Sequence, residues 1–470
     1  MQSSLVRRAA LSWRAWILPA LLAAILGATA GRAQQAAPSN PPADAAEEIP
    51  SPRRLNAAPD SEAGAPGLSL PDALRWTIEH NPQLATLRKQ RGIALAGVMI
   101  ANTYPFNPIF QHFVMAGMGP FPDVTNHVFN EHTTRQDIEL FGQGKHRRAM
   151  AQAALSRTEW EIAAQELLTA IQMVRAFDTV LYRQDKLRVQ EELLSLQEDV
   201  MKKVEPLVQQ GHLPRTELML ARADLIDART ALGPARNQLV VAWNDLRRLL
   251  GMVDEHCSLQ GSLEAAFPDL GKVDLVAEAE KRRPDLHGLE EAIKETQAAL
   301  RLQIANRWGN PSLGPATEVN ETSVAFAGMW LIWSPPIFNT RKGEIMQRQA
   351  DVARAMQAAR SLGITIHQDV LAALKRLHSA AEVVEMYRTT SLPELRKDLE
   401  GFDQLFKRGE PGVTLARVIA IRTRLIQTRS AYLDALFELS QARADLAAAV
   451  GDPSLTVPLP ALAAAPPNPH

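Results

Sequence analysis

Residues 145–205 read KHRRAMAQAALSRTEWEIAAQELLTAIQMVRAFDTVLYRQDKLRVQEELLSLQEDVMKKVE and contain neither glycine nor proline. Apolar residues recur in this stretch at spacings of three, four and seven, among them Leu167, Ile171, Val174 and Leu181. Such spacing predicts one amphipathic helix. At about 1.5 Å per residue this helix is roughly 90 Å long, far longer than a globular domain is wide. We therefore expect it to pack along other long helices.

Further helices are expected on both sides of this stretch. A second long helix is predicted from about 344 to 405, broken at Gly363 and Pro393. Pro234, which follows Gly233, predicts a kink in one of the shorter helices, because a proline removes a backbone hydrogen bond. The shorter helices are expected at residues 71–101, 216–250, 290–306 and 414–450.

Two segments between the helices, residues 106–141 and 311–338, are rich in aromatic residues, Thr, Gly and Pro, and are predicted to form β-hairpins. Within 134–141, the charged residues alternate with uncharged ones, which gives one largely charged strand face. Within 324–337, both faces are apolar or aromatic and include Trp330 and Trp333. This second pattern suits a strand in contact with lipid.

The sequence repeats itself with a period near 200 residues, which indicates a tandem duplication. Three blocks recur in the same order. Asn81-Pro82 corresponds to Arg283-Pro284, Phe141 and Lys145 correspond to Phe338 and Lys342, and Arg222, Asp245 and Gly251 correspond to Arg422, Asp445 and Gly451. Each repeat is therefore expected to contain a helix, a β-hairpin, a long helix and a further helix.

Residues 1–33 have the pattern of a secretory signal peptide, because Arg7 and Arg8 precede an apolar run that ends near the small residues Ala30 and Ala33. Cleavage is expected after one of these two alanines. The alternative, a membrane anchor, is disfavoured because the apolar run is shorter than the roughly 20 residues that span a bilayer. Cys257 is the only cysteine, which excludes a lipidated N-terminal cysteine and an intramolecular disulfide.

These features divide the chain into six parts. The signal peptide is followed by residues 34–67, an Ala/Pro-rich stretch that we expect to be a disordered or wrapping arm. The others are the first repeat (68–251), a connection between the repeats (252–272), the second repeat (273–451) and a Pro/Ala-rich tail (452–470).

The mature chain has no run of 18 apolar residues, so it can cross a membrane only with strands. Two hairpins supply too few strands for a closed barrel, and open sheet edges in hydrocarbon leave backbone groups unpaired. Three copies would supply twelve strands, an even number within the known range. The expected fold is therefore mainly α with membrane β: a homotrimer that forms a long-helix α-barrel and a 12-stranded β-barrel.

From about Leu68 to Gly451, this pattern resembles the TolC-type outer-membrane efflux factors. The resemblance is carried by residues 68–74 with Asn81-Pro82, by the junction IELFGQGK (138–145) and by the junction PPIFNTRKGEI (335–345). The second junction is similar to that of the heavy-metal (CzcC-like) branch, although it departs from that branch at Thr340, where arginine is commoner.

The resemblance implies a passive outer-membrane conduit with a long periplasmic tunnel. Its implied partners are outer-membrane lipid, a periplasmic adaptor (membrane fusion) protein and an inner-membrane pump of the resistance-nodulation-division class. Heavy-metal cations are one expected cargo, and drugs or other small molecules are the alternative. A rival interpretation is a structural periplasmic coiled-coil protein, which would not need the two aromatic β segments. An exported enzyme is a more distant one.

The resemblance also implies that the adaptor docks at the tips of two helical hairpins. In each tip a glycine permits a tight reversal and a threonine is expected to cap the next helix, although ordinary turns use the same residues. Acidic residues before the second tip would form a ring of charge at the tunnel mouth, or simply a solvated helix face. The docking residues are Gly211, Leu213, Thr216, Gly409, Val413 and Thr414, and the gate residues are Asp398, Glu400 and Asp403.

No catalytic residue, cofactor or bound metal is expected. The sequence has no Walker A, GxGxxG or GxSxG motif, and its eleven histidines include no HExxH pair. His256 beside Cys257 is too small a group for a tetrahedral metal site. With 51 Lys and Arg against 52 Asp and Glu, the net charge is close to zero, so no nucleic-acid partner is indicated.

Overall fold

The computed structural model describes residues 67–117, 128–253, 258–264, 274–320, 323–408 and 415–456. Several sequence expectations lie outside these residues: the signal peptide, nearly all of the arm, His256 with Cys257, most of the C-terminal tail, and the docking residues Gly409, Val413 and Thr414.

The first repeat begins with a short strand and ends with a helical hairpin. Its longest helix runs through Gly144 at one end and Pro206 at the other, so it extends beyond both ends of the predicted 145–205 stretch. At about 1.5 Å per residue it is roughly 100 Å long. The elements are β1 (Gly67–Ser69), α2 (Leu70–His80), α3 (Pro82–Asn102), β2 (Ile109–Ala116), β3 (Val128–Asp137), α4 (Gln143–Gln209) and α5 (Arg215–Leu250).

The second repeat has the same order of elements. The elements are β4 (Ser258–Gln260), α6 (Leu275–Arg282), α7 (Pro284–Asn306), β5 (Ser312–Val319), β6 (Ala325–Ile332), α8 (Lys342–Met386), a π-helical segment η1 (Tyr387–Ser391), α9 (Leu392–Lys407), α10 (Leu415–Val450) and a 3-10 turn η2 (Pro453–Leu455).

The two hairpins join into one four-stranded antiparallel sheet of order β2-β3-β5-β6, so both edges, β2 and β6, are open within this chain. A second, very small sheet pairs β1 with β4 in parallel. The predicted strand at 134–141 is wrong at its C-terminal end. β3 stops at Asp137, and the backbone N–H of Ile138 instead donates to the carbonyl of Pro311 at 2.9 Å.

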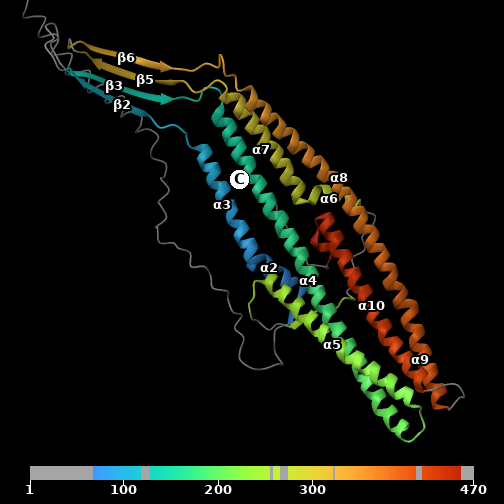
Figure 1. Cartoon of the computed structure of the whole chain (residues 1–470). Coiled ribbons are helices and arrows are strands. Elements are labelled where there is room, and N and C mark those ends of the chain that lie inside the picture. The colour runs from blue at the N-terminus through green and yellow to red at the C-terminus, as the bar shows by residue number, and fades with distance from the viewer. Residues whose placement is uncertain are drawn as a thin grey trace, which may run out of the picture. The chain divides into compact units, whose positions relative to one another are not determined.

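The helices next to the sheet follow the order of its strands (Figure 1). Because α3 leads into β2 and β6 leads into α8, the helical order α3-α4-α7-α8 places α3 and α8 at the same two edges as β2 and β6. Further from the sheet, α5 takes the place of α3, and α10 lies between α4 and α8. The open edges of the sheet and of the helical layer therefore coincide.

The main apolar core is centred on α4, where Met173, Val174, Phe177 and Val180 are almost completely buried. It draws on α2, α5, α8 and α10, so it ties the two repeats together. A second cluster around Ile366 and Val370 joins α6, α8 and the end of α10. The long helices are stabilised by these seams rather than by isolated helix propensity.

The duplication is visible in matching helix breaks. The predicted helix at 71–101 is in fact two helices, because Pro82 starts α3 and the residue before a proline is driven into an extended conformation. Pro284 starts α7 in the same way after Arg283. This second break follows α6, a helix that the sequence analysis missed.

Each break packs against the end of a partner helix. Gly251 ends α5 with φ +71°, and a Cβ there would lie 3.0 Å from the His80 carbonyl. Gly451 follows α10 with φ +79°, and a Cβ there would lie 3.2 Å from Cγ of Arg283. Gly251 and Gly451 thus occupy equivalent places in the two repeats.

Two predicted helix interruptions differ from the structure. α8 passes through Gly363 without a break. Near Pro393 the chain remains helical, but the turn before it, η1, widens into a π-helix. Proline lacks an N–H and clashes with the preceding turn, and a π-bulge is a common way to accommodate the misfit. At Pro234, α5 is continuous.

Of the helices in the described residues, none is long and apolar enough to span a bilayer.

Candidate functional site

The two faces of the four-stranded sheet have different charge. The register aligns Phe113, Glu131, Glu318 and Phe326 in one row across all four strands, so these side chains share a face. Arg135 and Asp137 lie on this same face, since strand residues two apart point the same way. We call this the charged face. The opposite, uncharged face carries no Asp, Glu, Lys or Arg within the strands that the structure describes.

The uncharged face is also the more exposed one. Along β5, Leu313, Pro315 and Thr317 on the uncharged face are exposed, whereas Gly314 on the charged face is buried and Glu318 is half-buried. This alternation indicates that the sheet curves with its charged face inward. Charge and curvature thus agree on which face would be directed toward water and which toward an apolar surrounding.

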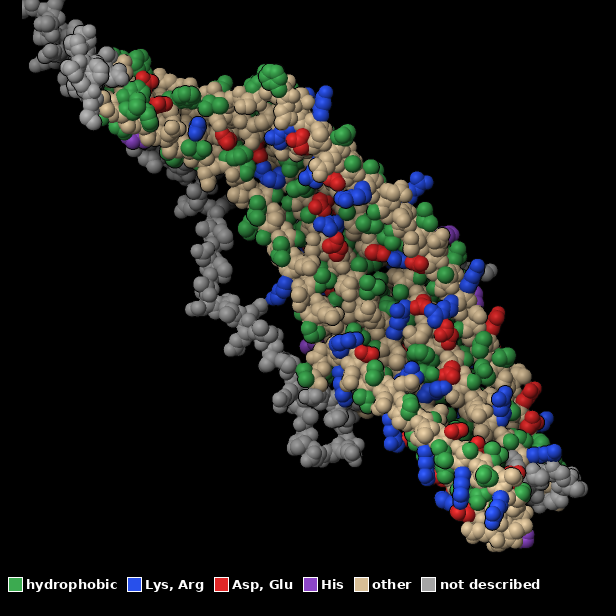
Figure 2. Space-filling model, in the orientation of Figure 1, with side chains coloured by type: hydrophobic (Ala, Val, Ile, Leu, Met, Phe, Trp, Pro, Cys, Tyr) green, Lys and Arg blue, Asp and Glu red, His purple; other side chains and the backbone are tan. Residues whose placement is uncertain are grey.

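Every residue of the edge strands β2 and β6 is exposed. Hydrophobic side chains are prominent over the sheet in Figure 2, whereas charged side chains crowd the helices. Large apolar residues continue down the adjoining helices α3 and α8, including Ile93, Ile100, Met346 and Ile364 with 56–75% of their surface exposed. An apolar seam of this extent marks a site of association rather than a water-facing surface.

The first helical tip is built as expected around Gly211. Gly211 has φ +74°, its N–H donates to Val208 O at 3.1 Å, and the N–H of His212 donates to Leu207 O at 2.9 Å. This pair of bonds closes the end of α4 in the pattern for which glycine is favoured. Leu213 then folds back onto a cluster of Val200, Val204 and Ala221.

Thr216 does not cap the next helix, contrary to the sequence expectation. The N-cap of α5 is Pro214, which makes no side-chain capping bond, and Thr216 is an exposed residue of the first turn. Proline at this position already has an extended conformation, which starts the helix without a side-chain acceptor. The hydroxyl of Thr216 is therefore presented on the tip surface.

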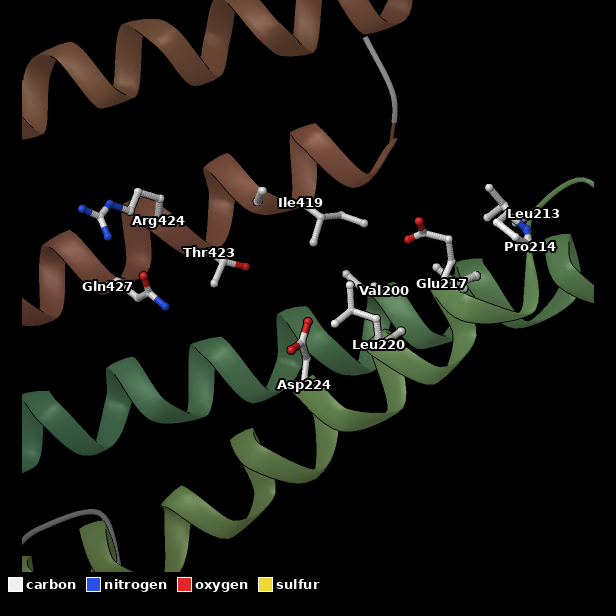
Figure 3. Close-up of a pocket in the computed structure, with 13 residues that line it drawn as sticks. Val200, Leu213, Pro214, Glu217, Leu220, Asp224, Ile419, Thr423, Arg424 and Gln427 are labelled. Atoms are coloured by element: carbon white, nitrogen blue, oxygen red, sulfur yellow. The ribbon is translucent and has the colours of Figure 1, made fainter. Parts of the chain in front are cut away.

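A groove of about 470 Å³ lies beside this tip, between the α4–α5 hairpin and α10. Ile419 on α10 points toward Val200 on α4, and Leu220 on α5 lies next to them (Figure 3). Glu217, Asp224 and Arg424 surround this apolar floor with charge.

The three acidic residues before the second tip do not form a single cluster. All lie on α9, but at about 100° per residue Asp398 projects well away from Glu400 and Asp403. Asp403 is half-buried and pairs with Arg422 of α10 at 2.9 Å. Asp398 and Glu400 are exposed.

A half-buried carboxyl that the sequence analysis missed lies deeper in the helical layer. Burial raises the pKa of Asp178 on α4 to about 7, although a hydrogen bond with Ser440 and the charge of Arg443 oppose this shift. Ser440 and Arg443 both lie on α10. Because carboxyls are common on helix surfaces, the sequence gives no sign that this one is half-buried. Asp178 therefore joins the two repeats in a pH-sensitive contact.

No group of three or more His, Cys, Asp or Glu in the described ranges is arranged to hold a metal ion. His112 and His132 form a stacked pair on the uncharged face, with ring centroids 4.1 Å apart. The sequence alone does not reveal this pair, because His112 and His132 become neighbours only through the register of β2 with β3.

Comparisons with known proteins agree with this geometry. Residues 76–252 match the family described as "Outer membrane efflux protein". The sequence search of curated proteins found no match. Among solved structures, the fold is similar to that of CusC, with a TM-score of 0.69 and 17% identity over 84% of this chain and 96% of that one.

The fold is also similar to the open state of the MtrE outer membrane channel of Neisseria gonorrhoeae, with a TM-score of 0.67 and 15% identity over 82% of this chain and 90% of that one. VceC of Vibrio cholerae gives a TM-score of 0.62 and 12% identity over 82% and 96% of the two chains. At these identities the structures show a shared fold.

The family comprises outer-membrane channels rather than enzymes. Its sequence match covers most of the first repeat, and the shared fold extends over both repeats. Residues 76–252 thus match the family of outer membrane efflux proteins, and the fold of both repeats is similar to that of CusC.

Proposed function

We propose that this protein is the outer-membrane channel of a tripartite efflux system, in which three copies form a passive conduit. One observation carries the proposal: the open edges of the sheet, β2 and β6, are continuous with the open, apolar edges of the helical layer, α3 and α8. Two different edges on one subunit form a head-to-tail contact, and repeated contacts of this kind give a ring when the rotation between subunits closes.

The direction of the edge strands supports closure. With four strands in successive antiparallel pairs, β2 and β6 run in opposite directions. The β6 edge of one copy can then pair antiparallel with the β2 edge of the next, and no backbone edge is left in hydrocarbon. The charged face lines the pore and the uncharged face contacts lipid, which avoids placing Glu131, Arg135 and Glu318 against the bilayer core.

The groove at the first tip is the proposed docking place for the periplasmic adaptor, which in turn contacts an inner-membrane pump. Its apolar floor and charged rim suit an amphipathic helical hairpin. Gly211, Leu213 and Thr216 are the proposed docking residues of this tip, and the resemblance assigns the same role to Gly409, Val413 and Thr414, which lie outside the described residues. Asp398, Glu400 and Asp403 are proposed as an acidic constriction, with Asp403 held by Arg422.

The cargo is proposed to include heavy-metal cations, on the strength of the second junction, residues 335–345. Transport of drugs or other small molecules through the same architecture is the alternative. Deleting the gene and measuring tolerance to metal salts and to lipophilic drugs separates the two. Lower tolerance to metal salts alone supports metal efflux, and lower tolerance to drugs alone supports the alternative.

Channel formation itself is tested by reconstituting the purified protein in planar bilayers. We expect a stable conductance that requires a three-chain assembly. A protein that is recovered from the soluble periplasm after gentle lysis, and that produces no conductance, would contradict the proposal.

Docking is tested with Leu220→Glu, which places a charge on the groove floor at a residue that is already 59% exposed, so that folding is not perturbed. We expect loss of adaptor co-purification with normal assembly. Leu168→Glu is the matched control, since Leu168 is 49% exposed on α4 outside the groove. Equal adaptor recovery with both variants would argue against docking in this groove.

A further inference from the structure

The junction between the sheet and the helices carries a belt of aromatic and basic side chains that the channel architecture alone does not explain. We define this junction belt as Phe141, Lys145, Arg301, Arg307, Trp308 and Trp333. These residues lie where β3 leads into α4, where α7 ends before β5, and where β6 ends before α8.

The aromatic members are held in fixed positions and exposed. The Phe141 ring stacks on Trp308 with centroids 5.7 Å apart, and Trp333 Nε1 donates to the Trp308 carbonyl at 2.9 Å. Gln143, itself buried, accepts from the Phe141 N–H at 2.9 Å. Between 37% and 46% of each of the three rings remains exposed. Rigid, half-exposed tryptophans are typical of the boundary between hydrocarbon and headgroups.

The basic members are not neutralised by nearby acids. Within the described residues, no carboxylate lies within ion-pair distance of Lys145, Arg301 or Arg307. The pKa of His146 reports the resulting field: burial lowers it, and the charges of Lys145 and Arg301 lower it further. Lys145 on α4 and Arg301 on α7 therefore act on the same place from two helices. The Arg307 guanidinium lies 5.8 Å from the Trp308 ring centroid.

Other residues at the same end of the helices are also mostly basic. Residues 301–308 contain Arg301 and Arg307 and no acid, and at the same end of the layer α8 starts with Arg341 and Lys342 against one acid, Glu344. Glu139, an acid at this level, is already bound to Arg147. An uncompensated basic surface next to an apolar sheet matches the charge of anionic headgroups.

We propose that the junction belt binds anionic phospholipid headgroups of the periplasmic leaflet, with the aromatic rings at the hydrocarbon boundary and Lys145, Arg301 and Arg307 on the phosphates. This inference rests on the proposed channel function, because the sheet must lie in the bilayer for the belt to reach the headgroups. The belt would fix the depth of the channel in the membrane and make its stability depend on lipid charge.

The test uses the full-length protein reconstituted in nanodiscs of phosphatidylcholine with or without phosphatidylglycerol. Bound lipid is counted by native mass spectrometry after release into detergent. We expect preferential retention of phosphatidylglycerol, reduced roughly 25-fold in Lys145→Gln/Arg301→Gln, because each basic residue near an anionic surface contributes roughly a factor of five in affinity.

The matched control, Arg236→Gln/Arg248→Gln, removes the same charge from exposed positions on α5. It is expected to retain phosphatidylglycerol like the parent. If the double belt variant fails to assemble, Lys145→Gln alone is measured with an expected reduction of roughly fivefold. Equal retention of the two lipids by the parent, or equal loss in belt and control variants, would overturn the inference. A parent protein that inserts into neither type of nanodisc would overturn the channel function as well.

Discussion

The two long helices α4 and α8 hold equivalent places in the two repeats but differ in how much of their length is buried. Buried residues recur along nearly the whole of α4, from Gln143 to Val204, because α3, α5, α7 and α10 all pack against it. In α8 they are confined to the second half, from Ile366 to Val384, and Met346 and Met356 in the first half are exposed. The two repeats thus contain one long helix that is covered by other helices of the same chain, α4, and one whose first half is left uncovered, α8.

This difference shows which helix surface is left without a packing partner in the single chain. An amphipathic helix with a second apolar face gains free energy only when another surface covers that face. For α4 the covering helices come from the same chain. For α8 they come, in our account, from α3 and α5 of a second copy. Substitutions in the two helices should therefore act on different properties, folding for α4 and assembly for α8.

The largest expected effect is on the core side of α4. Phe177→Ala removes a ring that is 1% exposed, and we expect it to lower the free energy of unfolding by about 3–5 kcal/mol. Leu371→Ala on α8, where the residue is 43% exposed, should lower it by less than about 1 kcal/mol. Chemical unfolding in detergent at one protein concentration measures both. Similar losses would contradict the contrast between the helices.

The next effect is the pH dependence from Asp178. Because the folded state raises its pKa to about 7, the folded state holds a proton that the unfolded state releases. Stability is therefore greatest below the ordinary value near 3.8 and falls as the pH rises toward 7. The total change is up to about 4 kcal/mol for a shift of this size.

Asp178→Asn should remove this slope, so that the variant gains stability relative to the parent between pH 4 and 7. Lys375, the exposed residue at the corresponding position of α8, serves as the control through Lys375→Gln, which should leave the slope unchanged. Unfolding midpoints across this pH range give the answer. An unchanged slope in Asp178→Asn would show that Asp178 is not the titrating group.

The helix breaks of the two repeats give a smaller and more specific comparison. Gly251→Ala and Gly451→Ala both place a side chain at positive φ, which costs about 1–3 kcal/mol. Gly251→Ala should be the more damaging, because its Cβ would lie 3.0 Å from the rigid His80 carbonyl, whereas at Gly451 the nearest atom is Cγ of Arg283 at 3.2 Å and the nearest backbone atom lies at 3.4 Å. Thermal midpoints of the two variants rank them. A lower thermal midpoint for Gly451→Ala than for Gly251→Ala would mean that the chain around the end of α10 is more rigid than the chain around the end of α5.

The smallest expected effect concerns the residues that join each break to its partner helix. Asn81 caps α3 through Oδ1, which accepts from Gln83 and Leu84, and its Nδ2 donates to Leu249 O at 2.9 Å. Arg283 makes no capping bond and reaches Ala449 O only at 3.4 Å. Asn81→Ala should cost about 1–2 kcal/mol and Arg283→Ala less, as measured by the same unfolding experiment. Equal costs would show that the cap contributes little.

Much of the architecture could be predicted from the sequence because long-range helical periodicity and an internal repeat are local signals. The duplication, the long helices and the two β-hairpins were all confirmed. The missed breaks at Asn81 and Arg283 have a local cause that was present in the sequence, since proline follows each. At Asn81 the prediction failed because apolar periodicity continued on both sides of the break, whereas before Arg283 the eight-residue helix α6 was not predicted at all.

The site was less accessible to sequence reasoning. The charged and uncharged faces depend on the register of β3 with β5, which are far apart in the chain. The ion pair of Asp403 with Arg422, on the next helix, could not be read from the sequence either, and the gate assignment of Asp403 stays a prediction. Thr216 was assigned as a cap because threonine commonly caps helices, but the helix starts earlier, at Arg215. The strand register and the Asp403 ion pair depend on contacts between segments, whereas the Thr216 error is a local one about where the helix begins.

The central claim is that the exposed edges of one chain are covered by further copies of it. The most direct test is the native mass of the protein extracted from membranes in mild detergent, compared with Ile100→Glu/Met346→Glu, which charges both helical edges at residues exposed by 71% and 68%. We predict an assembly of three chains for the parent and separate, folded chains for the variant. A monodisperse, folded monomer of the parent protein would contradict the account.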